Sequence, residues 1–260
     1  MDSAPACPRP AISPTADYWI ESRQPLASLA FVLPLLVAYE AGVLMLGPQA
    51  VRNGADVWLR QFLELAGLGQ YFLLPVLTIC ILIAWHHTTR RPWRVRGGVF
   101  WGMVAESVFL AFCLRVILEL QGSLLQAIAG PVGVWPQPAA MGGELASSMR
   151  SMVGFLGAGV YEELLFRLIL LSVLAATARR MGAASQPAVV AAVLLTSLAF
   201  AGAHYVGPYG EPVDLLSFPF WFSFVFRFLA GVFFGVLFVY RGFGIATGSH
   251  AGYDILVGAL

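Results

Sequence analysis

The chain has 260 residues, of which 59% are hydrophobic and only 11% are charged, and its mean hydropathy is +0.79. A soluble domain carries about one-quarter charged residues, so this composition excludes an ordinary soluble globular protein and predicts a polytopic membrane protein with an all-α fold. The formal net charge of +1 gives no reason to expect nucleic acid as a partner.

Residues 1–25 are predicted to form a cytoplasmic N-terminal segment. They contain five prolines and no apolar core, which is unlike a cleaved signal peptide. The apolar stretch that begins at Leu26 is long enough to stay in the bilayer, and we expect it to anchor the chain there.

Apolar stretches of about the 20 residues that a helix needs to cross a bilayer recur along the rest of the chain. They lie at about 27–46, 70–85, 99–118, 151–176, 188–206, 219–240 and 244–260. The sequence therefore predicts a transmembrane helix bundle with about seven spans, within a range of six to eight. The segment 122–146 is predicted to be a loop or a re-entrant segment, because its apolar pattern is interrupted by Gly130, Pro131, Pro136 and Pro138.

The arginines predict how the chain is oriented in the membrane. Basic residues cluster in two of the predicted loops: Arg90, Arg91, Arg94 and Arg96 after the second span, and Arg179 and Arg180 after the fourth. Because an excess of basic residues marks cytoplasmic loops, both loops and the N-terminus are predicted to be cytoplasmic. Arg52 and Arg60 depart from this pattern. We expect a multi-pass protein of the inner (plasma) membrane.

Three formal charges lie inside the fourth predicted span, at Glu162, Glu163 and Arg167. A charge at mid-bilayer costs at least about 2.5 kcal/mol, so such residues normally face the bundle interior and have partners. Glu163 precedes Arg167 by four residues, the spacing of an ion pair along an α-helix. Glu162 and Glu163 are adjacent, hence about 100° apart around an α-helix, and are predicted to lie on different faces. Glu162 is then expected to project toward another helix.

Two histidines and an aspartate lie in later spans. His204 follows Phe200 by one helical turn, among small residues that allow helices to approach closely. His250 precedes Asp254 by one turn on the same face of the last span. Two interpretations are open here: a buried polar network that only holds helices together, and a functional site, where intramembrane ionisable groups usually cluster.

The segments EELLFR (162–167), FAGAH (200–204) and HAGYD (250–254) resemble the three motifs EExxxR, FxxxH and HxxxN or HxxxD of the CPBP (Abi) family of intramembrane proteases. This family includes the type II CAAX prenyl endopeptidases. The order of the motifs and their distribution over three helices also agree. The resemblance covers about 150–260, which we interpret as a CPBP-like catalytic core that follows N-terminal transmembrane helices and a loop at 26–149. It implies an endopeptidase that hydrolyses a peptide bond of a membrane-associated protein or peptide in the lipid bilayer.

The resemblance also implies roles for the motif residues. Glu162 corresponds to the catalytic glutamate that activates water, and His204 to the residue that holds this water or polarises the scissile carbonyl. His250 and Asp254 correspond to the third motif, which stabilises the developing oxyanion. An ionised aspartate cannot donate a hydrogen bond, so Asp254 is protonated, orients His250 through its ring N–H or helps to hold a cation. Of these three roles we favour the orienting one. The supporting residues are Glu163 and Arg167, as an ion pair, and Phe200, as packing.

Zinc is an open alternative at this stage. The family is often labelled as metalloproteases, and Glu162, His204 and His250 form a ligand set that occurs in catalytic zinc sites. The HExxH spacing is absent, however, so these ligands would have to come from separate helices. The same residues serve a metal-free, glutamate-activated water equally well. The three cysteines show no CxxC spacing, which supports neither a disulfide framework nor a thiolate metal site.

Two other classes of function compete with the protease. One is a non-catalytic membrane immunity or partner-binding protein, and the other is a proton-coupled transporter, in which the same groups would relay protons. The charges outside the motifs are interpreted as ion pairs or helix-end residues: Glu40, Glu106, Arg115, Glu119 and Arg227. For Arg227 two partners are open: Glu211 or Asp214 of the preceding loop, and a substrate terminus. A prenylated CAAX substrate is not assigned from the sequence.

Overall fold

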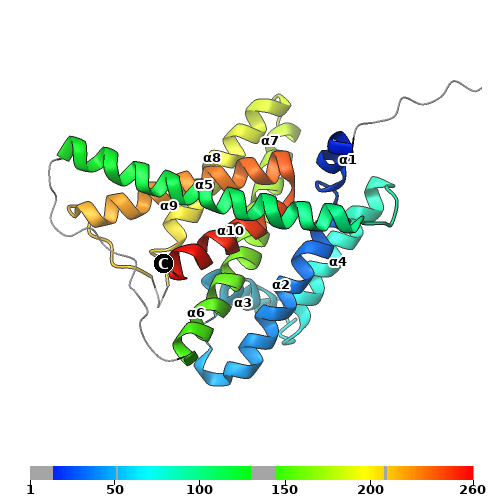
Figure 1. Cartoon of the computed structure of the whole chain (residues 1–260), viewed down its shortest axis with the longest axis horizontal. Helices are drawn as coiled ribbons and strands as arrows, with labels where there is room; N and C mark the ends of the chain where they lie inside the picture. The colour runs from blue at the N-terminus through cyan, green and yellow to red at the C-terminus, as the bar shows by residue number, and fades with distance from the viewer. Residues whose placement is uncertain (1–13, 51, 130–144, 208–209, 260) are drawn as a thin grey trace, which may run out of the picture.

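The computed structural model describes residues 14–50, 52–129, 145–207 and 210–259. All regular elements in these ranges are helical, which confirms the predicted all-α fold (Figure 1). In chain order they are α1 (Pro14–Glu21), α2 (Pro25–Leu46), η1 (Gly47–Gln49), α3 (Gly54–Leu65), α4 (Leu73–Thr89), α5 (Gly97–Ala129), α6 (Leu145–Gly157), η2 (Ala158–Leu171), α7 (Ser172–Arg180), α8 (Ser185–Ala203), α9 (Phe218–Arg241) and α10 (Phe243–Ala259).

Among the described residues, α2, α8 and α9 are long and apolar enough to cross a membrane, and α4 is a shorter apolar helix. Large apolar side chains are exposed on the outer faces, where they suit hydrocarbon and would be unfavourable in water. Examples are Leu33, Val37 and Leu44 on α2, Phe109 and Phe112 on α5, Leu194, Leu195 and Leu198 on α8, and Trp221 and Val236 on α9. These features fit a multi-pass membrane protein. The number of about seven spans and the cytoplasmic N-terminus stay predictions.

Helix α5 is longer than the sequence analysis predicted. It continues to Ala129, so the loop expected from residue 122 was wrong for the stretch up to 129, and residues 130–144 lie outside the described residues. The predicted loop rested on the later glycine and prolines, whereas residues 122–129 are mostly leucine, glutamine and alanine, which favour helix. The short helices α1 and α3 were also not predicted, and residues 1–13 lie outside the described residues.

Helices α6, η2 and α7 follow one another without a break as a single rod from residue 145 to residue 180. The central part, η2, is π-helical. In Figure 1 the rod passes from α6 at the bottom of the view, behind α10, to α7 at the top. In a π-helix the hydrogen bonds join residues i and i+5, and such segments are frequent at functional sites. The wider turn changes which side chains share a face of the rod.

The largest hydrophobic core joins the N-terminal and C-terminal parts of the chain. It contains Phe31 and Leu36 of α2, Val160 and Leu164 of η2, and Phe243 and Ile245 of α10. Helix α10 packs against α5, η2, α9 and α2, and its residues 243–251 are all buried. The helix that carries the third motif therefore lies inside the bundle, where helices from both parts of the chain hold it.

Candidate active site

Glu162 and Glu163 of η2 meet His250 of α10. Oε1 of Glu163 lies 2.8 Å from Nδ1 of His250, and Oε2 of Glu162 lies 3.7 Å from Nε2 of the same ring. All three side chains are buried. Because a carboxylate accepts hydrogen bonds, Nδ1 of His250 is the donor to Glu163. The first and third motifs thus form one cluster.

The two adjacent glutamates meet the same imidazole at its two different nitrogens. The sequence predicted that Glu162 projects toward another helix, and its contact with α10 fits this expectation. In the π-helical η2 each residue turns through somewhat less than the roughly 100° of an α-helix, because one turn takes in more residues.

Gly159 lets η2 approach α10 closely enough for these contacts. A Cβ built at Gly159 would lie 2.6 Å from Cβ of Ala251 and 2.8 Å from its backbone nitrogen. Gly231 has the same function between α9 and α8, since a Cβ there would lie 2.9 Å from Cα of Ser197. Small residues thus set the helix spacing around the site.

The ring of His250 is fixed by stacking and by one hydrogen bond. Phe234 of α9 stacks on it with ring centroids 4.4 Å apart and an interplanar angle of 16°. We expected Asp254 to orient this ring, but Oδ2 of Asp254 lies 3.8 Å from Nε2, which is too long for a hydrogen bond. Glu163 makes the orienting hydrogen bond instead.

Arg167 is buried beside Glu163, with its side chain only 1% exposed. Its Nη1 lies 3.1 Å from Oε1 of Glu163, which confirms the predicted ion pair. Its guanidinium lies over the ring of Phe200 at 4.4 Å from the centroid, and Nη2 donates to the carbonyl of Gly231 at 3.3 Å. Phe200 also packs edge-on against His204 and His250. The interpretation of Phe200 as a packing residue fits these contacts.

His204 stands directly after the end of α8. Its Nδ1 lies 2.9 Å from the backbone carbonyl oxygen of Phe200. A carbonyl oxygen only accepts, so Nδ1 carries the proton of the neutral ring and Nε2 is left as an acceptor. His204 and Glu162 together line two neighbouring cavities.

Asn53, which the sequence analysis missed, contacts Glu162 from the N-terminal part of the chain. Its Nδ2 donates to Oε1 of Glu162 at 2.7 Å. Oε2 of Glu162, the other carboxylate oxygen, is buried and has no hydrogen-bond partner among the described residues. The two residues are 109 positions apart, so no local pattern pairs them. The one sequence signal for Asn53 was its position directly before the segment GADVW, since asparagine is a common residue at the start of a helix.

Two cavities meet at Glu162. The larger, of about 770 Å³, is bounded by α8, α9 and α10, and its wall includes His250, Asp254 and Arg227. The smaller, of about 430 Å³, lies beside the start of α3, and its wall includes Asn53 and Trp58. Both are lined by Glu162, His204 and Glu211. Glu162 therefore lines both the larger and the smaller cavity.

An ion pair closes part of the wall of the larger cavity. Both carboxylate oxygens of Glu211 accept from the guanidinium of Arg227, and Nη1 donates at 2.9 Å. The expectation that Arg227 meets an acidic residue of the preceding loop is confirmed. Glu211 lies outside the helices, and the Arg227 guanidinium lowers the pKa of this carboxyl below its ordinary value, which keeps it ionised.

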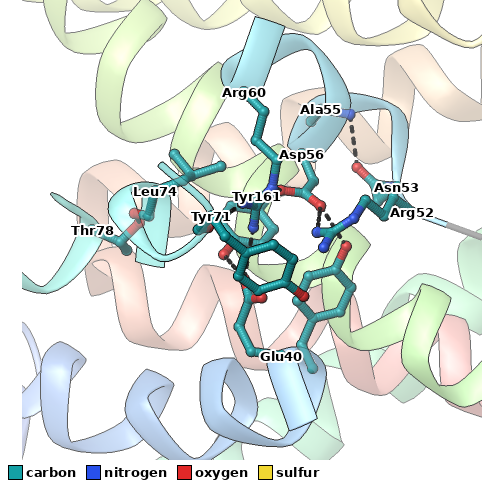
Figure 2. Close-up of polar contacts among 11 residues, drawn as sticks. Glu40, Arg52, Asn53, Ala55, Asp56, Arg60, Tyr71, Leu74, Thr78 and Tyr161 are labelled. Carbon is teal, nitrogen blue, oxygen red and sulfur yellow. Dashed lines mark hydrogen bonds and ion pairs between the residues drawn. The ribbon is translucent and has the colours of Figure 1, made fainter. Parts of the chain in front are cut away.

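A second polar cluster lies next to Asn53 in the fold and joins α2, α3 and η2 (Figure 2). Asp56 accepts hydrogen bonds from Tyr39 at 2.7 Å, from Arg52 at 2.7 Å and from Arg60 at 2.6 Å. Arg60 also pairs with Glu40 at 3.0 Å, and Glu40 accepts from Tyr161 at 2.6 Å. The ion-pair interpretation is confirmed for Glu40, and likewise for the pairs Arg115–Glu119 and Arg241–Glu106.

The possible zinc ligands do not form a metal-binding group. In the described part of the chain, no set of three or more histidine, cysteine, aspartate or glutamate side chains is arranged to hold a metal ion. The arrangement of side chains in the described residues thus gives no support to a metalloprotease.

The fold and the site define a class: a helical, multi-pass membrane protein with buried carboxylates and histidines at the wall of an internal cavity. The family model of the Type II CAAX prenyl endopeptidase Rce1-like proteins matches residues 145–256. This segment is therefore similar to the Rce1-like family, in agreement with the CPBP (Abi) resemblance of its three motifs. The similarity points to protease activity at a membrane. No curated protein and no solved structure matches the chain.

Proposed function

We propose that this protein is an intramembrane endopeptidase in which Glu162 activates a water molecule. The observation that carries the proposal is the state of the Glu162 carboxylate. One oxygen is held by Asn53, while the other is buried, free of hydrogen bonds from described residues and close to His250. A desolvated carboxylate of this kind is suited to take a proton from water.

The reaction then proceeds through a tetrahedral intermediate. Oε2 of Glu162 takes a proton from water while the water oxygen bonds to the scissile carbonyl carbon, and the carbonyl oxygen becomes an oxyanion. Glu162 next gives this proton to the amide nitrogen, the C–N bond breaks, and an acid and an amine leave. His204 holds the attacking water, since its free Nε2 is a hydrogen-bond acceptor in the neutral ring.

His250 is assigned to the oxyanion. In its protonated form the ring has an N–H on each nitrogen, so Nε2 can donate to the oxyanion while Nδ1 stays bound to Glu163. Glu163 and Arg167 are supporting residues that hold this ring and the helix. Asp254 lies on the cavity wall beside Nε2, where its carboxylate offsets the positive charge of His250.

The two cavities favour cleavage within a chain over trimming at its end. Because Glu162 and His204 line both, a peptide bond placed at Glu162 has room for residues on either side. An apolar hollow of about 560 Å³ between α5 and α9 shares Phe222 with the larger cavity. Its other lining residues include Leu120, Trp221 and Val225. This apolar hollow would suit the apolar segment of a membrane-associated substrate that approaches the larger cavity from the lipid.

The test compares membranes from cells that express the wild-type protein or Glu162→Gln. New peptide termini in membrane proteins are measured by mass spectrometry of labelled termini. We expect wild-type-dependent termini that disappear with Glu162→Gln, because the amide cannot accept the proton of water. Wild-type and variant proteins with equal insertion and the same set of termini would contradict the proposal. A cellular phenotype that persists in the variant would favour partner binding instead.

A further inference from the structure

We infer that Asn53 is a positioning residue for the reaction: it holds Oε1 of Glu162 and thereby directs Oε2 toward the water between His204 and His250. This inference rests on the proposed function of Glu162. Asn53 lies outside the segment 145–256 that matches the family, so the N-terminal part of the chain would contribute to the catalytic geometry.

The orientation of the Asn53 amide follows from its two hydrogen bonds. Asn53 is the N-cap of α3, and its Oδ1 accepts from the backbone N–H of Ala55 at 2.9 Å. The oxygen is thus assigned by the cap, and the group that faces Glu162 must be the NH₂ donor. This donor lies 2.7 Å from Oε1, which is the acceptor in the hydrogen bond.

Asn53 is flanked by a network of hydrogen bonds and ion pairs. Its neighbour Arg52 is bound to Asp56, whose carboxylate is fully buried and binds Arg60 and Tyr39 as well. Arg60 connects this group to Glu40 and Tyr161 (Figure 2). Tyr161 directly precedes Glu162 in η2. The same polar cluster thus fixes the start of α3 and the backbone beside the catalytic carboxylate.

Glu162 needs this restraint because another strong partner is near. Nε2 of His250 lies 3.7 Å from Oε2, and a small rotation of the carboxylate would turn this separation into a direct ion pair. Such a pair would occupy the oxygen that has to accept the proton of water. The hydrogen bond from Asn53 opposes that rotation, in the manner of the outer-shell partners that hold catalytic groups in productive geometry.

The experiment separates the positioning role from the capping role. Serine and aspartate cap helices about as well as asparagine, so Asn53→Ser and Asn53→Asp should keep the cap of α3 and lose only the hydrogen bond to Glu162. Neither presents the NH₂ donor to Glu162, and aspartate repels it. With a membrane substrate whose cleavage requires Glu162, we expect kcat to fall about 100-fold for Asn53→Asp and about 10-fold or more for Asn53→Ser, with KM little changed. Asn53→Ala should lower the unfolding temperature as well, because it also removes the cap.

A measurement of stability tests the contact without any need for turnover. Unfolding temperatures of Asn53→Ser, Glu162→Ala and the double variant form a cycle, and we expect the two single losses to be non-additive, since both remove the same bond. Additive losses would overturn the inference. So would wild-type kcat in Asn53→Asp and Asn53→Ser, or a change confined to KM, which would make Asn53 a substrate contact.

Failure of the proposed function is recognised separately. Equal turnover by the wild type and Glu162→Gln contradicts the proposed role of Glu162 and does not involve residue 53. Loss of turnover with Glu162→Gln together with full kcat in the folded Asn53 variants contradicts only the positioning role.

Discussion

Glu162 and Glu163 are adjacent in the chain but have different partners. Glu163 lies between two basic side chains, at 2.8 Å from Nδ1 of His250 and 3.1 Å from Nη1 of Arg167. Glu162 binds the neutral amide of Asn53 and borders the cavities. The buried charge of Arg167 is compensated by Glu163 alone at ion-pair distance, among the described residues. The two glutamates should therefore respond differently to the same substitution.

Glu163→Gln is expected to destabilise the protein by about 3–5 kcal/mol, because it leaves the guanidinium of Arg167 buried without a counter-ion. Thermal unfolding in detergent measures this change. Glu162→Gln is the matched control: it should abolish turnover with a much smaller effect on stability, since no buried cation loses its partner. Equal unfolding temperatures for the two variants would contradict this division of roles.

At the scale of elements, close packing of η2 on α10 decides which side chains meet. Adjacent glutamates of the π-helical η2 reach the two nitrogens of His250, and Gly159 allows η2 to pack directly on the backbone of α10. The spacing between η2 and α10 thus controls the distance from the carboxylate of Glu163 to the imidazole of His250. A single methyl group at this contact is enough to disturb it.

Gly159→Ala is expected to cost about 1–3 kcal/mol of stability, since its Cβ would lie 2.6 Å from Cβ of Ala251. It should also reduce turnover, because η2 must move away from His250. Gly154→Ala in the same rod is the control: a Cβ there has no atom within 4 Å, and alanine favours helix. Thermal unfolding and reporter cleavage are the measurements. If Gly159→Ala behaves like Gly154→Ala, the close approach does not limit the site.

At the scale of the whole molecule, the segment that matches the family is not independent of the rest. The hydrophobic core contains side chains from α2, η2 and α10. The polar cluster around Asp56 joins α2 and α3 to the backbone next to Glu162. The three motifs thus work inside a frame that the N-terminal helices complete.

Asp56→Asn tests this frame. Asp56 is fully buried and compensates two arginines, so the substitution is expected to cost about 3–5 kcal/mol and to lower turnover although all three motifs are intact. Glu119→Gln is the control, because its exposed pair with Arg115 should contribute no more than about 1 kcal/mol. The readouts are the unfolding temperature and the cleavage rate per folded protein. Equal behaviour of the two variants would mean that the buried cluster does not support the site.

Much of this could be predicted from the sequence, because it depends on composition and on neighbours along one helix. Hydrophobic content predicted a helical membrane protein, and the spacing of Glu163 and Arg167 predicted their ion pair. The membrane fold and the ion pair need only local rules: the cost of charge in hydrocarbon and the i,i+4 geometry of a helix. The family was indicated by the resemblance of the three motifs.

Other features were decided only by the tertiary structure. The π-helical turn, the hydrogen bond from Glu163 and not Asp254 to His250, and the contact of Asn53 with Glu162 all depend on how distant segments pack. Glu163 and His250 are 87 positions apart, and Asn53 and Glu162 are 109 apart. Over such separations the partner of a buried polar group is set by packing and desolvation, because each group must find whichever donor or acceptor the folded bundle places beside it.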